Sequence, residues 1–309
     1  MIPTSEFAPV AIFAFNRPGH LLRLLRDMET NPEFDDSPLF IFCDGARTES
    51  ERCLVEQVRI IAKDFCHSKK VVVESKNNQG LANSIINGVS QLCSAFGCVI
   101  VVEDDLAIDA GFLTYMNSAL KRYAGEPRVM QISGHIFPFD ASSDDEAFFM
   151  PVTTSWGWAT WERAWSMMEE NRELALLRLR SRRWRYDFDL CGCFPNSRML
   201  LDRLRGNNNS WAIWWYFNVF EENGLVLFPA RSFVNNKGFD GTGTHCANKF
   251  VEHSELLGVK VSKFPEVEVN VKALQGYGNF LKHDRGFIKV GFDHLWRIFY
   301  PSRVHQVDC

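Results

Sequence analysis

The sequence predicts an α/β protein with a doubly wound, mainly parallel sheet that carries helices on both faces. Two observations predict this fold class. Along the first part of the chain, short apolar runs alternate with segments whose apolar residues recur at helical spacing. Polar residues follow these runs at the points where strands would leave a sheet. Strands that alternate with helices favour parallel pairing through right-handed crossovers.

Five apolar runs are short enough to be buried strands. They cover residues 10–15, 39–43, 71–73, 99–102 and 129–133. The run at 99–102 is the clearest, because all four of its residues are β-branched and a parallel strand is apolar on both faces.

Four segments between these runs have the periodicity of amphipathic helices. The first begins at Pro18, which suits the first turn of a helix, and the third opens at Gly80. The periodic apolar residues are Leu21, Leu24, Leu25 and Met28 in the first helix, Leu54, Val58, Ile61 and Phe65 in the second, Leu81, Ile85, Val89 and Leu92 in the third, and Phe112, Leu113, Met116 and Leu120 in the fourth.

Three carboxylates, Glu103, Asp104 and Asp105, end the strand expected at 99–102. Adjacent carboxylates repel one another, and a hard divalent cation such as Mg²⁺ or Mn²⁺ is the usual way to stabilise them together with a substrate phosphate. If the extended geometry continues, Glu103 and Asp105 project to one side and Asp104 to the other. The alternative is a solvated acidic loop or the N-cap of a helix.

Polar residues also follow the first two expected strands. Asn16 and Arg17 end the first, and Asp44 with Gly45 ends the second. Ligands of doubly wound sheets bind beyond the carboxyl ends of the strands, so these residues and the acidic cluster predict one site for a phosphate-bearing ligand. The first strand–helix turn has neither a dinucleotide-binding nor a P-loop glycine pattern, which argues against those two classes of protein.

Composition narrows the class further. The hydrophobic fraction of 46% and the charged fraction of 23% are ordinary for a soluble enzyme. A net charge of −4 gives no reason to expect a nucleic-acid partner. The nine scattered cysteines are typical of reduced thiols, and with neither a signal peptide nor a run of about 20 apolar residues they predict a cytoplasmic protein. A zinc site at Cys191, Cys193, His245 and Cys246 is an alternative use of four of these side chains.

The chain is expected to have three parts. Residues 1–140 form the regular α/β half, residues 141–260 form a Trp-rich half that completes the domain, and residues 261–309 form a C-terminal tail. Tryptophan faces suit sugars, but most of these side chains are expected in the core, and the four-residue spacing of Trp161 and Trp165 suggests a helix face. Trp156 and Trp158 are the better candidates for ligand contact, because Gly157 between them permits close backbone approach.

Three other segments have features of binding surfaces. Residues 235–245 contain three glycines and are typical of a loop that closes over a ligand, offering Asp240 and His245. A basic run around Trp184 could meet a phospholipid surface or a diphosphate-bearing acceptor, or it could be a solvated helix face. The aromatic and basic stretch at 287–300 is consistent with contact at the inner face of a membrane or with docking on the core. The arginines of the basic run are Arg178, Arg180, Arg182, Arg183 and Arg185.

Over residues 10–245 the chain resembles the GT-A glycosyltransferases, in particular the animal N-acetylglucosaminyltransferases that initiate complex N-glycans and the bacterial family-2-like sugar transferases. The order and spacing of five motifs carry this resemblance, and the segment 238–245 resembles the bacterial relatives. The motifs are Asn16-Arg17 after a strand, the turn Cys43-Asp44-Gly45, Gln79-Gly80 at a helix start, Val101-Val102-Glu103-Asp104-Asp105, and Gly157-Trp158.

The resemblance implies a nucleotide-sugar donor, with UDP the expected nucleotide, and Mn²⁺ or Mg²⁺ as cofactor. Arg17 and Asp44 match positions that contact the nucleotide, and a carboxylate such as Asp44 can accept a hydrogen bond from a uracil N–H. Glu103 and Asp104 match positions that face the ribose and the sugar. Asp105 matches the metal-binding carboxylate, and His245 is the candidate second ligand. The remaining donor-side residues implied are Phe15, Asn16, Gly80 and Trp158.

One departure from the animal relatives concerns the general base. Their base is an aspartate that follows a tryptophan on a helix, whereas the matching segment 211–214 here has no carboxylate. An inverting transferase needs a base to take the acceptor proton. Asp240 is the substitute candidate, with Glu162 and Glu221 behind it. A retaining mechanism or a chain with little activity is also compatible with this gap.

The leading hypothesis is a metal-dependent glycosyltransferase that moves a hexosyl or N-acetylhexosaminyl group to a hydroxyl of a glycan or glycolipid. A sugar nucleotidyltransferase is a second hypothesis, although the first strand lacks the glycine-rich basic loop that such an enzyme would need. A third is a non-catalytic nucleotide- or glycan-binding protein, which the missing base keeps open.

Overall fold

The computed structural model describes residues 6–139, 145–238 and 260–283. Its strands are β1 (Val10–Ala14), β2 (Leu39–Cys43), β3 (Lys70–Glu74), β4 (Cys98–Glu103), β5 (Leu106–Ile108), β6 (Val129–Ser133), β7 (Ala147–Met150), β8 (Trp158–Trp161), β9 (Leu225–Pro229) and β10 (Val234–Asn236). Its helices are α1 (Pro18–Glu29), the short 3₁₀ helix η1 (Glu49–Glu51), α2 (Arg52–Asp64), α3 (Leu81–Phe96), α4 (Phe112–Arg122), α5 (Glu162–Trp165), α6 (Arg172–Arg178), α7 (Arg182–Phe188), α8 (Asn196–Leu204), α9 (Trp211–Glu221) and α10 (Val271–His283).

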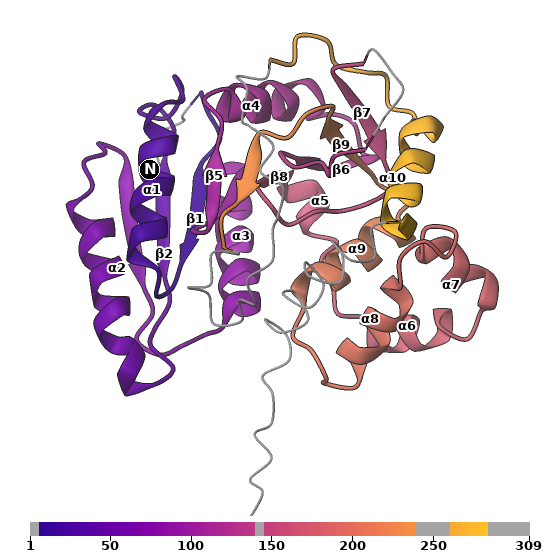
Figure 1. The fold of residues 1–309 in the computed structure, drawn as a ribbon, viewed down its shortest axis with the longest axis horizontal. Helices are drawn as coiled ribbons and strands as arrows, with labels where there is room; N and C mark the ends of the chain where they lie inside the picture. Colours follow the sequence, from indigo (N-terminus) through magenta and orange to yellow (C-terminus); the bar gives the residue numbers. More distant parts are fainter. Residues whose placement is uncertain (1–5, 140–144, 239–259, 284–309) are drawn as a thin grey trace, which may run out of the picture.

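An eight-stranded sheet forms the centre of the molecule, with the strand order β3-β2-β1-β4-β8-β6-β9-β7 (Figure 1). The neighbours β3-β2, β2-β1, β1-β4 and β6-β9 are parallel, whereas β8 runs antiparallel to β4 and β6, and β7 runs antiparallel to β9. The α/β fold class and the five predicted strands are confirmed. The insertion of β8 between β4 and β6 was not predicted.

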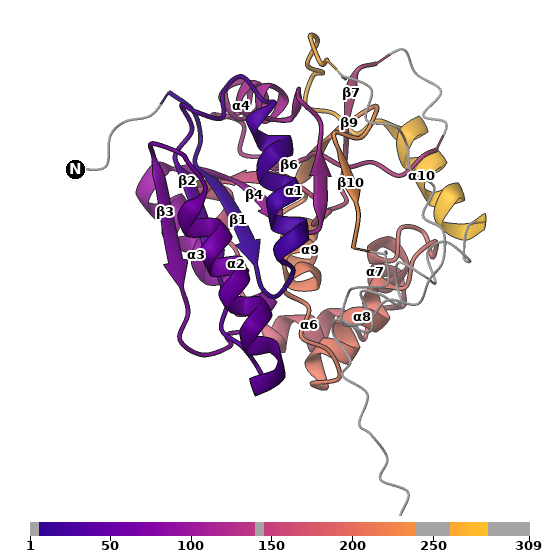
Figure 2. The same ribbon diagram turned by 60° about the vertical axis from the view of Figure 1, so that its left-hand side comes forward.

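Helices cover both faces of this sheet, as expected for a doubly wound fold. Alternate residues of each central strand point to opposite faces. Ile12 of β1 and Val102 of β4 belong to the apolar cluster that α1, α2 and α4 complete. Ala11 and Val101 belong to the cluster on the other face, which α3, α9 and α10 complete. Figure 2 shows α1 and α2 in front of the strands β1 to β3.

A third apolar cluster joins the short helices of the second half. Ala175 of α6, Phe188 of α7 and Leu200 of α8 pack with residues of α9 such as Trp214. Helix α9 is apolar on nearly its whole surface, because it is buried between the sheet and these helices. The helices α6 to α8 therefore attach to the sheet through α9 and form a lobe away from α1 and α2 (Figure 1).

The structure corrects two local expectations. Trp161 and Trp165 do not lie on one helix face, because Trp161 is the last residue of strand β8 and the four-residue helix α5 ends at Trp165. The segment 235–245 does not begin as a loop, because Asn235 and Asn236 are buried in β10, which pairs with β5.

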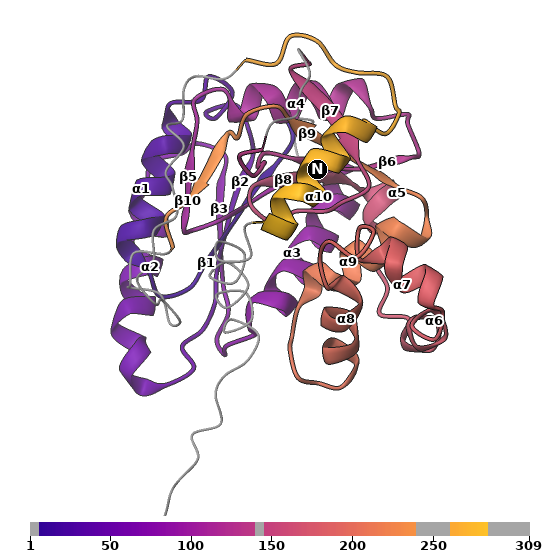
Figure 3. The same ribbon diagram turned by 45° about the vertical axis from the view of Figure 1, so that its right-hand side comes forward.

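Two findings concern the C-terminal part and membranes. Helix α10 docks Ala273, Tyr277 and Leu281 into the cluster formed with α3 and α9 (Figure 3). The stretch 287–300 lies outside the described residues. No helix in the described ranges is long and apolar enough to cross a membrane.

Candidate active site

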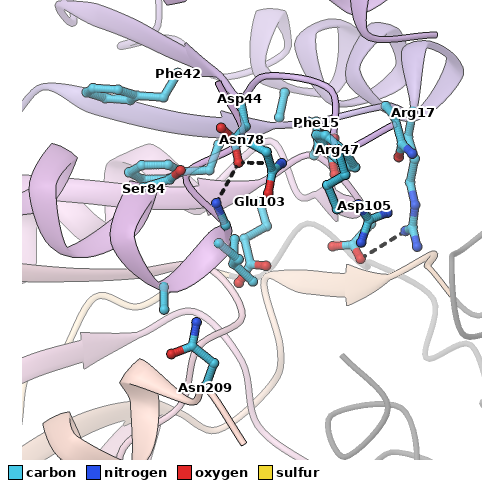
Figure 4. Close-up of a pocket in the computed structure, with 17 residues that line it drawn as sticks. Phe15, Arg17, Phe42, Asp44, Arg47, Asn78, Ser84, Glu103, Asp105 and Asn209 are labelled. Carbon is cyan, nitrogen blue, oxygen red and sulfur yellow. Dashed lines mark hydrogen bonds and ion pairs between the residues drawn. The ribbon is translucent and has the colours of Figure 1, made fainter. Parts of the chain in front are cut away.

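A pocket of about 260 Å³ opens at the carboxyl ends of β1, β2 and β4. After β1 the chain continues to β2 and β3 on one side, and then crosses to β4 on the other side of β1. This reversal is a topological switch point, where the loops after neighbouring strands diverge and leave a crevice. Figure 4 shows residues from these strand ends around the pocket.

The pocket gathers eight of the residues predicted from the sequence. They come from four segments that are distant in the chain, three of them at the ends of β1, β2 and β4, which supports the expectation that adjacent strand ends share a site. The eight residues are Phe15, Asn16, Arg17, Asp44, Gly80, Glu103, Asp104 and Asp105.

The acidic cluster occupies the wall formed by β4. Glu103 is the last residue of β4 and pairs in register with Phe13 of β1. Asp104 and Asp105 form a turn between β4 and β5, so the extended alternation expected for the three carboxylates does not continue. The backbone N–H of Phe15 donates to Asp104 Oδ2 at 3.2 Å, which ties this turn to β1.

Burial gives two of these carboxyl groups unusual proton affinities. Desolvation, with smaller contributions from the Asp105 and Asp104 charges, raises the pKa of Glu103 well above its ordinary value. Desolvation followed by the charge of Asp105 raises the pKa of Asp104 to about 7. Arg17 acts in the opposite direction on both groups. The cluster therefore favours additional positive charge.

Arg17 supplies part of that charge at the Asp105 end. Its Nη1 lies 3.2 Å from Asp105 Oδ2, and both side chains are about 15% exposed. Strand β10 brings a third element to this corner, because the N–H of Lys237 donates to the carbonyl of Asp105 at 2.8 Å. The next residue, Gly238, lies so close that a Cβ atom there would be 2.5 Å from Asp105 Oδ2 and would force this carboxylate to move.

Asp44 organises the opposite wall of the pocket. Its Oδ1 accepts the N–H groups of Gly45 and Gln79, each at 2.8 Å. Its Oδ2 accepts the Asn78 side-chain amide and the N–H of Gly80, each at 3.0 Å. A carboxylate has about four acceptor positions, so these protein donors fill them. The expected bond to a uracil N–H would have to replace one of these donors.

Four further polar residues line the pocket and were not predicted as site residues. The guanidinium carbon of Arg47 lies 4.8 Å from the Phe15 ring centre, and Arg47 also pairs with Glu51. Asn78 and Ser84 line the wall next to Asp44. The sequence signal that could have found these three residues is their position. Arg47 follows the second strand, and Asn78 and Ser84 lie around the start of the third helix. Asn209, from the loop before α9, faces the acidic cluster from the second half (Figure 4), and nothing in its local sequence indicated this.

Trp158 is not at the pocket, which corrects its expected role in donor binding. It is fully buried and stacks on Trp211 with ring centres 5.3 Å apart. The close approach expected at Gly157 is real, but it is made to the protein, since a Cβ atom there would be 2.7 Å from Val234. The tryptophans at β8 therefore build the core.

Glu162 is excluded from the expected role of general base by the antiparallel direction of β8. Trp161 pairs with Cys98 at the start of β4, and the N–H of Glu162 donates to the Gly97 carbonyl at 2.8 Å. Glu162 thus lies level with Gly97, at the opposite end of the strands from Glu103 and about 20 Å away along the strand. Glu221 is also engaged elsewhere, in an ion pair with Arg178 at 2.8 Å.

Asp240 and His245 lie outside the described residues. His245 and Cys246 of the alternative zinc site lie there too, and the structure has Cys191 and Cys193 as free thiols. In the described ranges no three His, Cys, Asp or Glu side chains are grouped to chelate a metal. The carboxylate oxygens at 103–105 nevertheless fit part of a Mg²⁺ or Mn²⁺ shell, because these ions usually take one or two carboxylates and complete their coordination with substrate phosphates and water.

Comparison with known proteins gives weak matches to solved structures. No family model and no curated protein matches the sequence. The crystal structure of S. aureus TarS 1–349 aligns with a TM-score of 0.43 and 9% identity, over 73% of this chain and 59% of that chain. The mannosyltransferase PcManGT from Pyrobaculum calidifontis, in complex with GDP-Man and Mn²⁺, aligns with a TM-score of 0.36 and 12% identity, over 72% of this chain and 71% of that chain. This chain thus spans about three fifths of the TarS fragment.

Proposed function

We propose that the chain is a glycosyltransferase of the GT-A type that uses a nucleotide diphosphate sugar. The observation that supports it most is the pocket at the switch point, where four carboxylates and two arginines surround a cavity of about 260 Å³. A neutral or purely cationic ligand does not need both acidic and basic side chains around it. A nucleotide sugar needs both, since it combines a diphosphate, hydroxyl groups and an aromatic base.

The residues divide among these parts of the donor. Arg17 and Arg47 provide the cations for phosphate, and the Phe15 ring offers a face for the base. Glu103 and Asp104 are acceptors for the hydroxyls of the ribose and the sugar. UDP is the proposed nucleotide, and a hexosyl or N-acetylhexosaminyl group is proposed to move to a glycan or glycolipid hydroxyl. A closer kinship with the animal N-acetylglucosaminyltransferases is proposed from the sequence motifs alone.

Asp105 is the proposed ligand for Mn²⁺ or Mg²⁺, with His245 as a second ligand. When bound, such an ion supplies Lewis-acid stabilisation of the negative charge on the leaving diphosphate. Arg17 adds to this stabilisation from the same corner, because its guanidinium already lies against Asp105.

Asp240 is the proposed general base. Asn209, which faces the acidic cluster from the second half, has an amide side chain that cannot take a proton at neutral pH. The described chain reaches Gly238 against Asp105, and Asp240 follows two positions later in the sequence. The base removes the acceptor hydroxyl proton as that oxygen bonds to the anomeric carbon. The bond from this carbon to the diphosphate oxygen breaks, and the nucleoside diphosphate leaves.

A panel of nucleotide sugars, each with and without Mn²⁺, tests the proposal by thermal shift and by slow donor hydrolysis. UDP-sugars are expected to raise the melting temperature only when Mn²⁺ is present. Asp105→Ala should abolish the metal-dependent turnover while the protein stays folded, and Asp64→Asn on exposed helix α2 is the matched control. If no donor changes the melting temperature, or if Asp105→Ala keeps wild-type turnover, the proposal is wrong.

A nucleotide-binding protein without transferase activity is the second candidate. It is favoured by one observation, that no carboxylate of the second half lines the pocket within the described residues. Asp240→Asn separates the two candidates. Loss of donor hydrolysis with unchanged UDP binding supports the transferase, whereas a wild-type protein that binds UDP and never turns a donor over supports the binding protein. A cytoplasmic location is proposed from the cysteine pattern.

A further inference from the structure

Helices α6 and α7 carry exposed apolar side chains at the edge of the molecule. Leu176 and Leu177 on α6 are 49% and 59% exposed, and Tyr186 on α7 is 50% exposed. Figures 1 and 3 place both helices on the outside of the lobe formed with α8. We call the exposed face of these two helices the α6–α7 surface, defined by Leu176, Leu177, Arg180, Arg182, Arg183 and Tyr186.

The local structure explains why these side chains face outward together. Ala175 and Phe188 turn inward and are buried with residues of α8 and α9, whereas Leu176, Leu177 and Tyr186 are exposed. The N–H of Arg180 donates to the Leu177 carbonyl at 3.2 Å, which holds Arg180 within one turn of the exposed leucines. Ser181 then caps α7 through the N–H of Trp184, so the two helices are joined by a tight connection.

The surface is strongly basic although the chain is acidic. Residues 172–187 contain six arginines and two acids, whereas the whole chain has a net charge of −4. Arg178 and Arg183 are paired with Glu221 and Asp187, each at 2.8 Å. Arg180 and Arg182 are exposed, and neither has a carboxylate within ion-pair distance in the described part of the chain. Glu173 is the remaining acid of the segment, so the surface keeps an excess of positive charge.

We propose that the α6–α7 surface binds the face of a bilayer that contains anionic phospholipids. Guanidinium groups pair with phosphate through two parallel hydrogen bonds, and exposed Leu and Tyr side chains enter the boundary between headgroups and acyl chains. Arginine next to exposed leucine suits both the anionic headgroups and the apolar boundary beneath them, whereas a soluble anion would contact only the arginines.

The position of the surface connects it with the pocket. Helices α6 and α7 pack on α8, and Asn209, five residues after the end of α8, lines the pocket. Binding through this surface would hold the pocket close to the bilayer, where a glycolipid acceptor would be presented. The inference itself does not depend on the proposed function, because binding is measured without any donor or acceptor.

Vesicle flotation of the full chain tests the proposal. The protein should float with vesicles of phosphatidylcholine mixed with phosphatidylglycerol, and not with phosphatidylcholine alone, and high salt should weaken the binding. Arg180→Glu with Arg182→Glu should lower the partition coefficient about tenfold or more, because each basic residue near the surface contributes to the attraction. Leu176→Ser with Leu177→Ser should lower it at unchanged charge.

Matched variants on other exposed faces control for charge and for apolar area. Lys121→Glu with Arg128→Glu makes the same change of charge near α4, and Leu54→Ser with Ile60→Ser removes exposed apolar residues from α2; both should float like wild type. Flotation that is absent, indifferent to lipid charge or unchanged in the α6–α7 variants overturns the proposal. A second outcome would also overturn it: the protein does not bind vesicles but binds inorganic pyrophosphate, and the arginine variants abolish that binding. The ligand of the surface would then be a soluble anion.

Discussion

Arg17 and Asp105 form an ion pair across the ends of β1 and β4, with 3.2 Å between Nη1 and Oδ2. The two residues lie 88 positions apart in the chain, and the parallel pairing of their strands brings them together. The guanidinium occupies an oxygen of the carboxylate that is proposed to hold the metal. If Asp105 holds the metal as proposed, the cation and Arg17 compete for this carboxylate until a diphosphate gives Arg17 another partner.

Arg17→Ala tests this competition. Without nucleotide, the variant should bind Mn²⁺ several-fold more tightly than wild type, because Asp105 is no longer neutralised. It should also bind UDP at least tenfold more weakly, because a phosphate contact is lost. Titration calorimetry measures both affinities. Arg47→Ala, which removes the other pocket arginine, should weaken UDP binding without tightening Mn²⁺ binding. Weaker Mn²⁺ binding by Arg17→Ala would contradict the competition.

Gly238→Ala should disrupt the same corner from the side of β10. The added Cβ atom would lie 2.5 Å from Asp105 Oδ2 and 3.0 Å from Arg17 Nη1, so the ion pair has to move. We expect the thermal shift with Mn²⁺ and UDP to be lost or strongly reduced. Gly125→Ala is the control, because a Cβ atom there has no neighbour within 4 Å in the described part of the chain. An unchanged shift in Gly238→Ala would show that Asp105 is not held as described.

The regular half of the fold was predictable because its signals are local. The run 99–102 is buried on both faces, and the apolar periodicity of residues 81–92 matches the inward face of α3. Strand β8 was not predicted, because the contacts that hold it are distant in the sequence. Trp158 and Trp161 each find a partner far along the chain, Trp211 for Trp158 and the Leu120 carbonyl for Trp161, and the tryptophan spacing alone suits a helix equally well.

The site was predictable where it depends on strand ends and unpredictable where it depends on loops. Glu103 and Arg17 follow recognisable strands, so their proximity follows from parallel pairing. Asn209 and Gly238 reach the site only through the path of the second half and of β10, which local sequence does not encode. Three of the four donors around Asp44 likewise come from a loop more than 30 positions away, and the fourth is the N–H of its neighbour Gly45.

Asp44→Asn tests whether this carboxylate organises the wall of the pocket. An asparagine keeps one acceptor oxygen and turns an NH₂ group toward two of the four donors, each of which then loses its partner. We expect the free energy of unfolding to fall by about 2–4 kcal/mol, with at least tenfold weaker UDP binding. Denaturant unfolding measures the first effect. Ser84→Ala, in the same wall, should stay within about 0.5 kcal/mol of wild type. A variant as stable as wild type would mean that Asp44 is free to read the base.

His135 gives the protein a defined acid sensitivity. It follows β6 and is 8% exposed. Its Nε2 is buried without a hydrogen-bond partner among the described residues, while Nδ1 lies 3.0 Å from Ser232 Oγ. Burial lowers the pKa of this imidazole from 6.5 to about 3. Below pH 6.5 the unfolded chain therefore binds a proton that the folded chain does not, so stability is fully present above pH 6.5 and is lost as the pH falls toward 3.

The expected loss from this one group is about 2 kcal/mol between pH 7 and pH 5. It is measured by comparing denaturant unfolding of wild type and His135→Phe at both values. The variant lacks the titrating ring, so its stability should fall by about 2 kcal/mol less over the interval, whatever its stability at pH 7. Phe137→Leu changes a ring that packs on His135 and retains the imidazole, so it should keep the wild-type slope. Equal slopes in wild type and His135→Phe would show that the histidine titrates in the folded protein much as it does in the unfolded chain.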